Sequence, residues 1–278
     1  MIQNNTGKEK ILLFIPGYNC EKQISRVLGQ LDNEILTYIS KVIMVNNRST
    51  DNTEQSVIDW GRQHKEVDFA LLRNDDNYNL GGSHKVVFDY AINGDFDYII
   101  VLHGDDQGNI HDLLPLLRNG IYTDFDCCLG ARFMKGSKLY GYSNLRIIAN
   151  NCFNLWFSIV TGRRILDLGS GLNMYKVDSL KSLYFLRYPD RLFFNDVMIL
   201  GAVYYKQKIK FFPISWKEED QVSNVKLFSF GMELLKMTLF FIFRRKAYMQ
   251  SDMRQKTVEK YTYQVIYEHQ KALGDSQT

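Results

Sequence analysis

The chain has 278 residues, of which 45% are hydrophobic and 23% are charged, as in ordinary folded proteins. Its formal net charge of +3 balances 34 Lys and Arg against 31 Asp and Glu, which argues against a nucleic-acid partner. The four cysteines lack CxxC spacing, which favours free thiols in a reducing compartment over disulfides or zinc ligands. Residues 1–5 are largely polar, unlike a signal peptide, so we expect a cytoplasmic protein.

Short apolar runs mark the strands expected in the N-terminal part of the chain. Continuous apolar segments predict buried strands at residues 11–15, 42–45, 69–72 and 98–102. Apolar residues at helical spacing predict helices over residues 24–35 and 83–92. This alternation is typical of an α/β fold with a mainly parallel, Rossmann-like sheet flanked by helices.

The remainder of the chain shows a less regular pattern. We predict short strands at residues 127–130, 172–175 and 209–214, and a long apolar helix over 145–160. Because no internal repeat or low-complexity linker interrupts the chain, we expect one main domain over residues 1–226. A C-terminal segment of amphipathic helices is expected over 227–278.

Residues 227–243 are strongly apolar but contain Glu233 and Lys236, and three basic residues follow at 244–246. A spanning helix needs about 20 largely apolar residues, so the two charges argue against a membrane span. The stretch is either a helix lying in the membrane interface or an amphipathic helix packed on the domain. From Ser251 onward the tail is polar and compatible with helix, with a disordered end.

The predicted strand at 98–102 ends in a cluster of oxygen and nitrogen donors, residues 103–107, with the sequence His-Gly-Asp-Asp-Gln. In open α/β sheets, ligands bind where the strands deliver their carboxyl ends. Two carboxylates, an amide and an imidazole at that edge can hold a divalent cation against a diphosphate. The alternative is an acidic turn that caps a helix.

Segments 15–19, 45–51, 79–82 and 103–107, taken in order, resemble the motifs of family 2 glycosyltransferases of the GT-A fold. Those motifs read I-P-x-Y-N, V-D-D-x-S-x-D, N-x-G and D-x-D. Residues 130–133 and 161–172 resemble the branch of polyprenyl-phosphate mannose and glucose synthases, and residues 222–226 lie where that branch has an acceptor-side G-x-S-K loop. The resemblance covers about residues 10 to 226.

The resemblance implies an inverting, metal-assisted transfer of a sugar from a nucleoside diphosphate sugar. The implied acceptor is a polyprenyl phosphate or a lipid-linked glycan, met by a peripheral protein at the inner face of the cell membrane. One alternative is transfer to a sugar hydroxyl in the synthesis of cell-surface polysaccharide. Another is a nucleotide-binding protein with impaired catalysis, because His103, Asn46 and Asn47 replace aspartates of the family motifs.

Alignment on Gln107 makes Asp105 the expected metal ligand and catalytic residue, with Gln107 beside it. His103 stands where the family has its first aspartate, so the second ligand is either His103 or Asp106. The cation implied is Mn²⁺ or Mg²⁺, and an imidazole ligand favours manganese.

The resemblance also implies a set of substrate-binding residues. Arg132 and Arg146 match arginines that hold phosphate groups, for which the guanidinium fork is suited. Arg132 is also a candidate catalytic residue, with a surface ion pair as its alternative, and Arg146 could instead be a solvated residue of a helix. Asp51 is either a substrate contact or a helix-start carboxylate. The remaining substrate-binding residues implied by the motifs are Pro16, Tyr18, Asn19, Asn46, Gly81, Gly104, Ser170 and Lys226.

Two further carboxylates have roles that depend on the acceptor. A sugar hydroxyl needs a general base, for which Asp196 is the first candidate. A lipid phosphate is already ionised near neutrality and needs no base. In that case we expect Asp167 to orient the loop 169–171 through backbone contacts.

Overall fold

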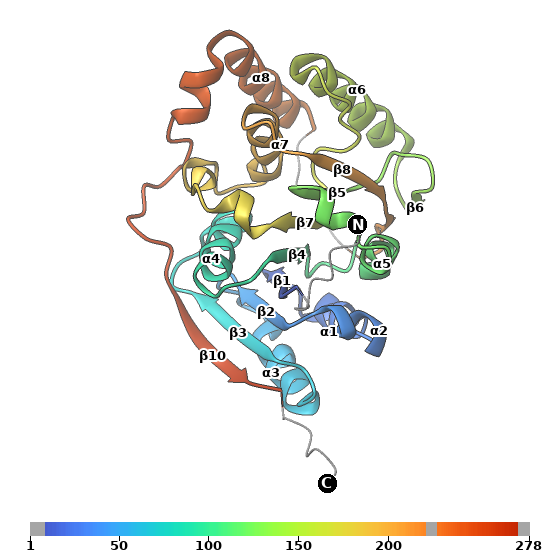
Figure 1. The fold of residues 1–278 in the computed structure, drawn as a ribbon, viewed down its shortest axis with the longest axis vertical. Helices are drawn as coiled ribbons and strands as arrows, with labels where there is room; N and C mark the ends of the chain where they lie inside the picture. Colours follow the sequence, from blue (N-terminus) through green and yellow to red (C-terminus); the bar gives the residue numbers. More distant parts are fainter. Residues whose placement is uncertain (1–8, 221–226, 272–278) are drawn as a thin grey trace, which may run out of the picture.

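The computed structural model describes residues 9–220 and 227–271, and a twisted sheet runs through its centre (Figure 1). In this described part, eight strands pair in the order β10-β3-β2-β1-β4-β7-β5-β8. They are β1 (Ile11–Gly17), β2 (Lys41–Asn46), β3 (Phe69–Asn74), β4 (Tyr98–Leu102), β5 (Cys127–Ala131), β7 (Leu172–Lys176), β8 (Ile209–Pro213) and β10 (Tyr263–His269). Only β7 and β10 run antiparallel to their neighbours among these strands, so the predicted mainly parallel sheet is confirmed.

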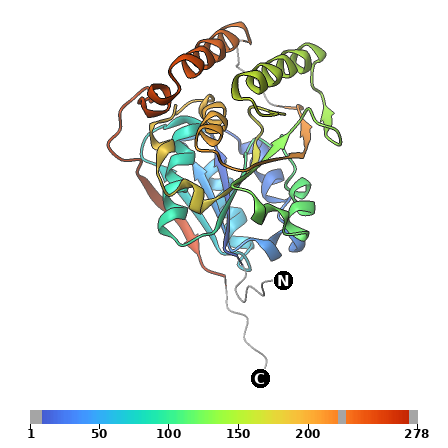
Figure 2. The same ribbon diagram turned by 45° about the horizontal axis from the view of Figure 1, so that its top comes forward.

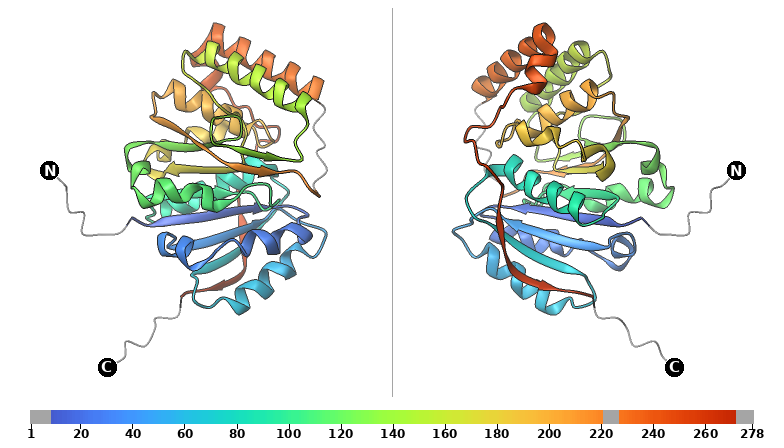
Figure 3. Two further views of the ribbon diagram at one scale, coloured as in Figure 1. Left: turned by 90° about the vertical axis from the view of Figure 1, so that its right-hand side faces the viewer. Right: turned by 60° about the vertical axis from the view of Figure 1, so that its left-hand side comes forward.

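Helices cover both faces of the sheet, which explains why the strands read as continuous apolar runs (Figure 3). The helices are α1 (Glu21–Leu28), α2 (Asn33–Tyr38), α3 (Thr53–Gln63), α4 (Asn79–Asn93), α5 (Leu114–Arg118), α6 (Asn144–Thr161), α7 (Phe194–Tyr204) and α8 (Leu227–Gln250). The single helix predicted over 24–35 is wrong, because α1 ends at Leu28. Asp32 then caps a second helix by accepting a hydrogen bond from the Ile35 amide at 2.9 Å.

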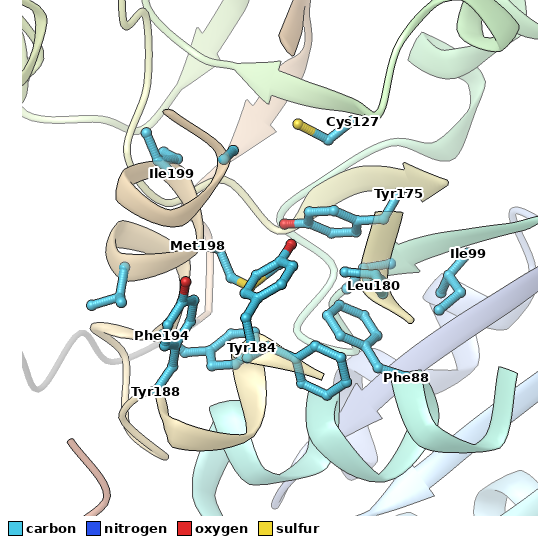
Figure 4. Close-up of a cluster of buried hydrophobic side chains, with 14 of the residues drawn as sticks. Phe88, Ile99, Cys127, Tyr175, Leu180, Tyr184, Tyr188, Phe194, Met198 and Ile199 are labelled. Atoms are coloured by element: carbon cyan, nitrogen blue, oxygen red, sulfur yellow. The ribbon is translucent and has the colours of Figure 1, made fainter. Parts of the chain in front are cut away.

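Alternate residues of β1 point into two separate cores. Leu12 and Phe14 belong to the core beneath α4 and α7, whereas Leu13 and Ile15 belong to the core beneath α1 and α3. Figure 4 shows the first core, where aromatic rings gather around Phe194 at the start of α7. This packing places the beginning of α7 firmly against α4.

The C-terminal tail forms a strand, so the helix expected beyond Ser251 is wrong in this region. β10 pairs antiparallel with β3 and closes that edge of the sheet (Figure 3). Tyr267 and His269 pack on Phe69 with ring centroids 6.3 and 6.0 Å apart, and Glu268 accepts a 2.6 Å hydrogen bond from Lys41. The free edge of β3 therefore decides the conformation of a segment whose own composition is polar.

A buried lysine fastens the segment between α8 and β10 to the domain. Lys85 on α4 is fully buried, and its ammonium donates hydrogen bonds to the Tyr188 carbonyl, the Asp190 carboxylate and the Tyr261 hydroxyl at 2.6, 2.6 and 3.0 Å. The Tyr261 hydroxyl also donates to Asp190 at 2.7 Å. The returning chain thus holds the segment that leads into α7.

α6 and α8 lie side by side on the outer side of α7, away from the main sheet (Figure 2). One face of α8 packs on the domain through Leu234 and Phe241, as one of the two sequence alternatives requires. Its axis is kinked at Arg244, where the backbone leaves helical geometry. None of the helices within 9–220 and 227–271 is sufficiently long and apolar to cross a membrane.

Candidate functional site

A cavity of about 420 Å³ opens where β1 and β4 end, as the strand-end rule predicts. Its lining comes from the turns after these strands, from Arg132 after β5, and from the facing sides of α6, α7 and α8. β9 (Ser215–Lys217), which pairs with β6 (Lys138–Tyr140) in a small second sheet, adds Trp216. A second hollow of about 510 Å³ lies along α6, but no carboxylate or imidazole of the described residues lines it.

The structure brings together many of the residues singled out from the sequence. Those that line the cavity are Pro16, Tyr18, His103, Gly104, Asp105, Gln107, Arg132, Arg146 and Asp196. Those outside its lining are Asn19, Asn46, Asp51, Gly81, Asp106 and Ser170. Lys226 lies outside the described residues.

Asp105 and His103 present their side chains to the cavity in different charge states. Burial raises the pKa of the Asp105 carboxyl to about 6, so this group gains from a nearby cation. Burial lowers the pKa of His103 to about 4, which keeps its imidazole neutral and able to act as a ligand. The His103 Nε2 atom is buried and has no hydrogen-bond partner among the described residues.

Asp106 points away from the cavity, so the expectation that it could be the second metal ligand disagrees with this geometry. Its backbone has a φ of +59°, which turns the side chain toward α1. There its carboxylate accepts hydrogen bonds from Arg26 at 2.5 Å and from Gln30 at 3.2 Å. Of the two second metal ligands that the sequence left open, His103 and Asp106, only His103 lines the cavity together with Asp105.

The cavity does not provide a complete metal cage from side chains. Among the residues that the structure describes, no group of three or more His, Cys, Asp or Glu side chains converges on one point. Asp105, His103 and Gln107 supply a carboxylate, an imidazole and an amide. This donor set suits a cation that takes its remaining ligands from substrate phosphates and water, as Mg²⁺ usually does.

Arg132 is fixed in the cavity wall by a buried ion pair with Asp167. Its Nε and Nη2 atoms donate to the two carboxylate oxygens at 2.8 and 2.7 Å, and its guanidinium lies 5.0 Å from the Trp216 ring centroid. Asp167 also accepts a hydrogen bond from the Gly169 amide at 3.2 Å. The expected loop-orienting contact of Asp167 is therefore present, and Arg132 contributes a positive charge in a fixed position.

Arg146 reaches the cavity from α6 but is already engaged. Its guanidinium donates to the Glu218 carboxylate at 2.5 Å and lies 4.8 Å from the centroid of the Tyr142 ring. A phosphate at this position would therefore compete with Glu218 for the arginine. Arg146 of α6 therefore lines the cavity and is not simply a solvated residue on the helix surface.

Three residues predicted to bind substrate do not line the cavity and instead form hydrogen bonds within and between the turns after β1 and β2. Asn46 donates to Glu54 and accepts from the Ser49 amide, both at 2.8 Å. Asn19 accepts from the Thr50 amide at 2.8 Å. Asp51 accepts from the amide of Thr53 at 3.1 Å, which matches its helix-start alternative. These contacts join the turn after β1 to the turn after β2.

Gly81 and Ser170 also have structural surroundings. A Cβ atom on Gly81 would lie 2.4 Å from the Pro189 carbonyl oxygen, so the small residue permits close packing of α4 against the segment before α7. The Ser170 hydroxyl donates to the Leu172 carbonyl at 3.2 Å. Gly104, by contrast, lines the cavity, where a Cβ would lie 2.9 Å from the Pro16 carbonyl oxygen.

Several cavity residues were missed by the sequence reasoning. They are Tyr142, Phe153, Asn195, Trp216, Glu218, Phe230 and Leu234. Asn195 directly precedes the predicted base Asp196, and this adjacency was the one available signal. Phe153 comes from α6, Phe230 and Leu234 come from α8, and Trp216 comes from β9, while Tyr142 precedes α6 and Glu218 follows β9. The placement of these segments over the cavity depends on long-range packing.

Asp196 is the buried carboxyl of the α7 side of the cavity, and burial raises its pKa well above the usual aspartate range. The unfolded chain ionises this carboxyl first, so Asp196 costs stability progressively as the pH rises above about 4. We expect D196N to be more stable than wild type at about pH 8 and equally stable below about pH 4. Urea unfolding at the two pH values measures this.

The control for this prediction is D167N. That substitution leaves Arg132 buried without its carboxylate and should lower stability at neutral pH by about 3 kcal/mol. A D196N protein less stable than wild type at about pH 8 would contradict the assigned surroundings of Asp196.

Comparisons with known proteins agree with this arrangement. The model of a family described as Glycosyl transferase family 2 matches residues 13–184. Undecaprenyl-phosphate mannosyltransferase of Micrococcus luteus is 24% identical over 176 residues, which cover 63% of this chain and 69% of that protein.

Two solved structures share the fold. Glucosyl-3-phosphoglycerate synthase from Mycobacterium tuberculosis, in complex with Mn²⁺, uridine diphosphate and glucosyl-3-phosphoglycerate, has a TM-score of 0.56 at 12% identity, over 92% of this chain and 87% of that one. TarS 1–349 of Staphylococcus aureus, in complex with UDP-GlcNAc, has a TM-score of 0.55 at 17% identity, over 86% of this chain and 69% of that one. These likenesses confirm the expected GT-A fold. Because the family model spans more than half of the chain, the protein belongs to the family 2 glycosyltransferases.

Proposed function

We propose that this glycosyltransferase moves one sugar, with inversion, from a nucleoside diphosphate sugar to a polyprenyl phosphate or a lipid-linked glycan. The observation that carries the proposal is that one cavity is lined by charged side chains where β4 and β5 end, here called the charged end, and by apolar side chains of α6 and α8, here called the apolar end. The likeness to undecaprenyl-phosphate mannosyltransferase supports a lipid acceptor.

The charged end suits a diphosphate. Asp105 and His103 lie at the end of β4, and Arg132 is fixed across from them by Asp167. We propose that Asp105, with His103 and Gln107, holds a divalent cation, Mn²⁺ or Mg²⁺, that neutralises charge on the leaving diphosphate. Support comes from the related synthase whose complex contains Mn²⁺ and uridine diphosphate. Arg132 adds a fixed positive charge without reorganisation during the reaction.

The apolar end suits a hydrocarbon chain. Ala149 and Phe153 of α6 face Phe230 and Leu234 of α8 across the same cavity. Phe230 also stacks on the Phe193 ring with centroids 4.5 Å apart, and Leu234 is buried, so this apolar lining is held in place by the protein itself. We propose that a polyprenyl chain lies against this apolar lining while its phosphate stays near Arg132 and Arg146.

We propose further that the outer surface of α6 and α8 rests on the inner face of the cell membrane. Exposed apolar side chains continue along both helices, including Leu155 and Ile159 on α6 and Phe243 on α8, which is 79% exposed. Basic residues flank them at 163–164 and 244–246. Apolar contact combined with basic anchors is the usual basis of peripheral binding to anionic lipid.

This surface gives a test by vesicle sedimentation. The double variant I159E/F243E should bind vesicles of anionic phospholipid at least about tenfold more weakly than wild type, because each substitution removes an apolar contact and adds a negative charge. The matched control is V265E, which changes an exposed apolar residue of β10 at the opposite end of the molecule (Figure 1). Equal binding by the double variant and wild type would contradict the membrane proposal.

Hydrolysis of the sugar donor tests the proposed cation ligand at the charged end of the cavity. D105A should lose Mn²⁺-stimulated hydrolysis of the donor by about 100-fold or more, because the cation loses its carboxylate ligand. A screen of common nucleotide sugars with Mn²⁺, with and without added polyprenyl phosphate, measures this. Full Mn²⁺-stimulated turnover by D105A would exclude the assigned ligand. A wild-type protein that binds nucleotide without Mn²⁺ dependence and turns over no donor would support the impaired, nucleotide-binding alternative.

A second candidate function is transfer to a sugar hydroxyl in the synthesis of cell-surface polysaccharide. It is favoured by the position of Asp196, a buried carboxyl in the cavity wall that could act as general base. With a phosphate acceptor, D196A should retain transfer within a few-fold, since an ionised phosphate needs no base. Loss of about 100-fold or more in D196A would favour the hydroxyl acceptor. Initial rates of wild type and D196A, measured with polyprenyl phosphate and separately with a sugar acceptor, decide between the two.

A further inference from the structure

Asn195 is a buried side chain in the cavity wall whose hydrogen-bonding capacity is not used by the protein. It is 7% exposed and lies in the first turn of α7, beside Asp196. Its Oδ1 atom is enclosed and has no hydrogen-bond partner among the described residues. A buried acceptor left in this condition costs folding free energy.

Other buried asparagines of the chain show the contrast. Asn154 donates its side-chain amide to the Leu166 carbonyl at 2.9 Å, and Asn173 donates to the Ser170 carbonyl at 2.9 Å. Both lie as deeply as Asn195. Asn74 also has a buried Oδ1 atom without a partner among the described residues, but its amide nitrogen donates to Asn47 at 2.8 Å and to Ser83 at 3.0 Å. Asn195 differs because its amide lies in a cavity wall, where a ligand can complete its hydrogen bonding.

The surroundings of Asn195 hold it rigidly in place. The preceding Phe194 is fully buried and packs against Phe88 and Tyr188 (Figure 4). The Gly81 amide donates to the Asp190 carbonyl at 2.7 Å, which fixes the segment that leads into α7. A side chain on such a support can discriminate between ligands that differ by one hydroxyl.

The division of the cavity indicates which part of the substrate meets Asn195. Asp105 and Arg132 suit phosphates, and the α6 and α8 side chains suit a hydrocarbon chain. Asn195 is a neutral hydrogen-bonding side chain in the same cavity, placed on α7 and belonging to neither of these sets. A neutral amide both donates and accepts, as does a hydroxyl group.

We propose that Asn195 binds a hydroxyl group of the sugar being transferred and determines which sugar the enzyme accepts. This inference rests on the proposed function and identifies the specificity-determining residue of the same site. With a hydroxyl acceptor, the general base is the neighbouring Asp196. With a phosphate acceptor, the acceptor phosphate lies near Arg132. Asn195 itself takes no part in bond making.

The test compares N195A and N195L with N154A. Donor hydrolysis is measured with Mn²⁺ for UDP-glucose, UDP-galactose, UDP-GlcNAc and GDP-mannose, and binding of UDP and GDP is measured by calorimetry. In both Asn195 variants, kcat/KM for the preferred donor should fall at least about tenfold, and its preference over the other sugars should decrease by a similar factor. Nucleoside diphosphate binding should be unchanged.

Stability provides the independent readout. N195L replaces an unsatisfied amide by an apolar group of similar size, so its midpoint of thermal unfolding should equal or exceed that of wild type. N154A should unfold at a lower temperature and keep the wild-type order of sugar preference.

Three results would overturn the inference. Unchanged sugar preference in both Asn195 variants excludes a role in specificity. Weaker binding of UDP or GDP alone would place Asn195 at the nucleotide. A lower unfolding temperature for N195L would show that the amide is structural. If wild type turns over none of the donors, the proposed function fails and this inference falls with it.

Discussion

The ion pair between Arg132 and Asp167 is the interaction on which the site depends. It joins the end of β5 to the loop before β7, and Asp167 uses the same carboxylate to hold the Gly169 amide. That loop in turn receives the His103 amide through the Gly171 carbonyl at 2.9 Å. One buried pair therefore fixes both the Arg132 guanidinium in the cavity wall and the turn that carries Asp105.

The cavity contains groups that the fold leaves unsatisfied. His103, Asn195 and Trp216 have enclosed atoms without partners among the described residues, and burial raises the pKa of the Asp196 carboxyl. Each of these groups costs folding free energy, and their concentration around one cavity is typical of a binding site. Hydrogen bonds near the cavity, such as those from Lys85 to Asp190 and Tyr261, offset that cost and hold the segment that leads into α7 in place.

Much of the fold and part of the site were predictable from residue patterns. The buried strands and the long helix α6 follow from apolar runs and spacing, since each pattern is local. The strand β10 was not predictable, because its conformation comes from pairing with the free edge of β3. Asp106 and His103 could not be distinguished either, because Arg26 and Gln30 that hold Asp106 lie far away in the chain.

The sequence by itself determined the buried strands β1 to β4, the long helix α6, the cluster at residues 103–107, and the family to which these motifs point. Local periodicity and motif spacing carry that information. Only the tertiary structure decided which of the motif side chains face the cavity. Asn46, Asp51 and Asp106 do not line it, because they form hydrogen bonds with other residues of the protein. The tertiary structure also decided the apolar wall between α6 and α8, since their contact joins segments distant in the chain.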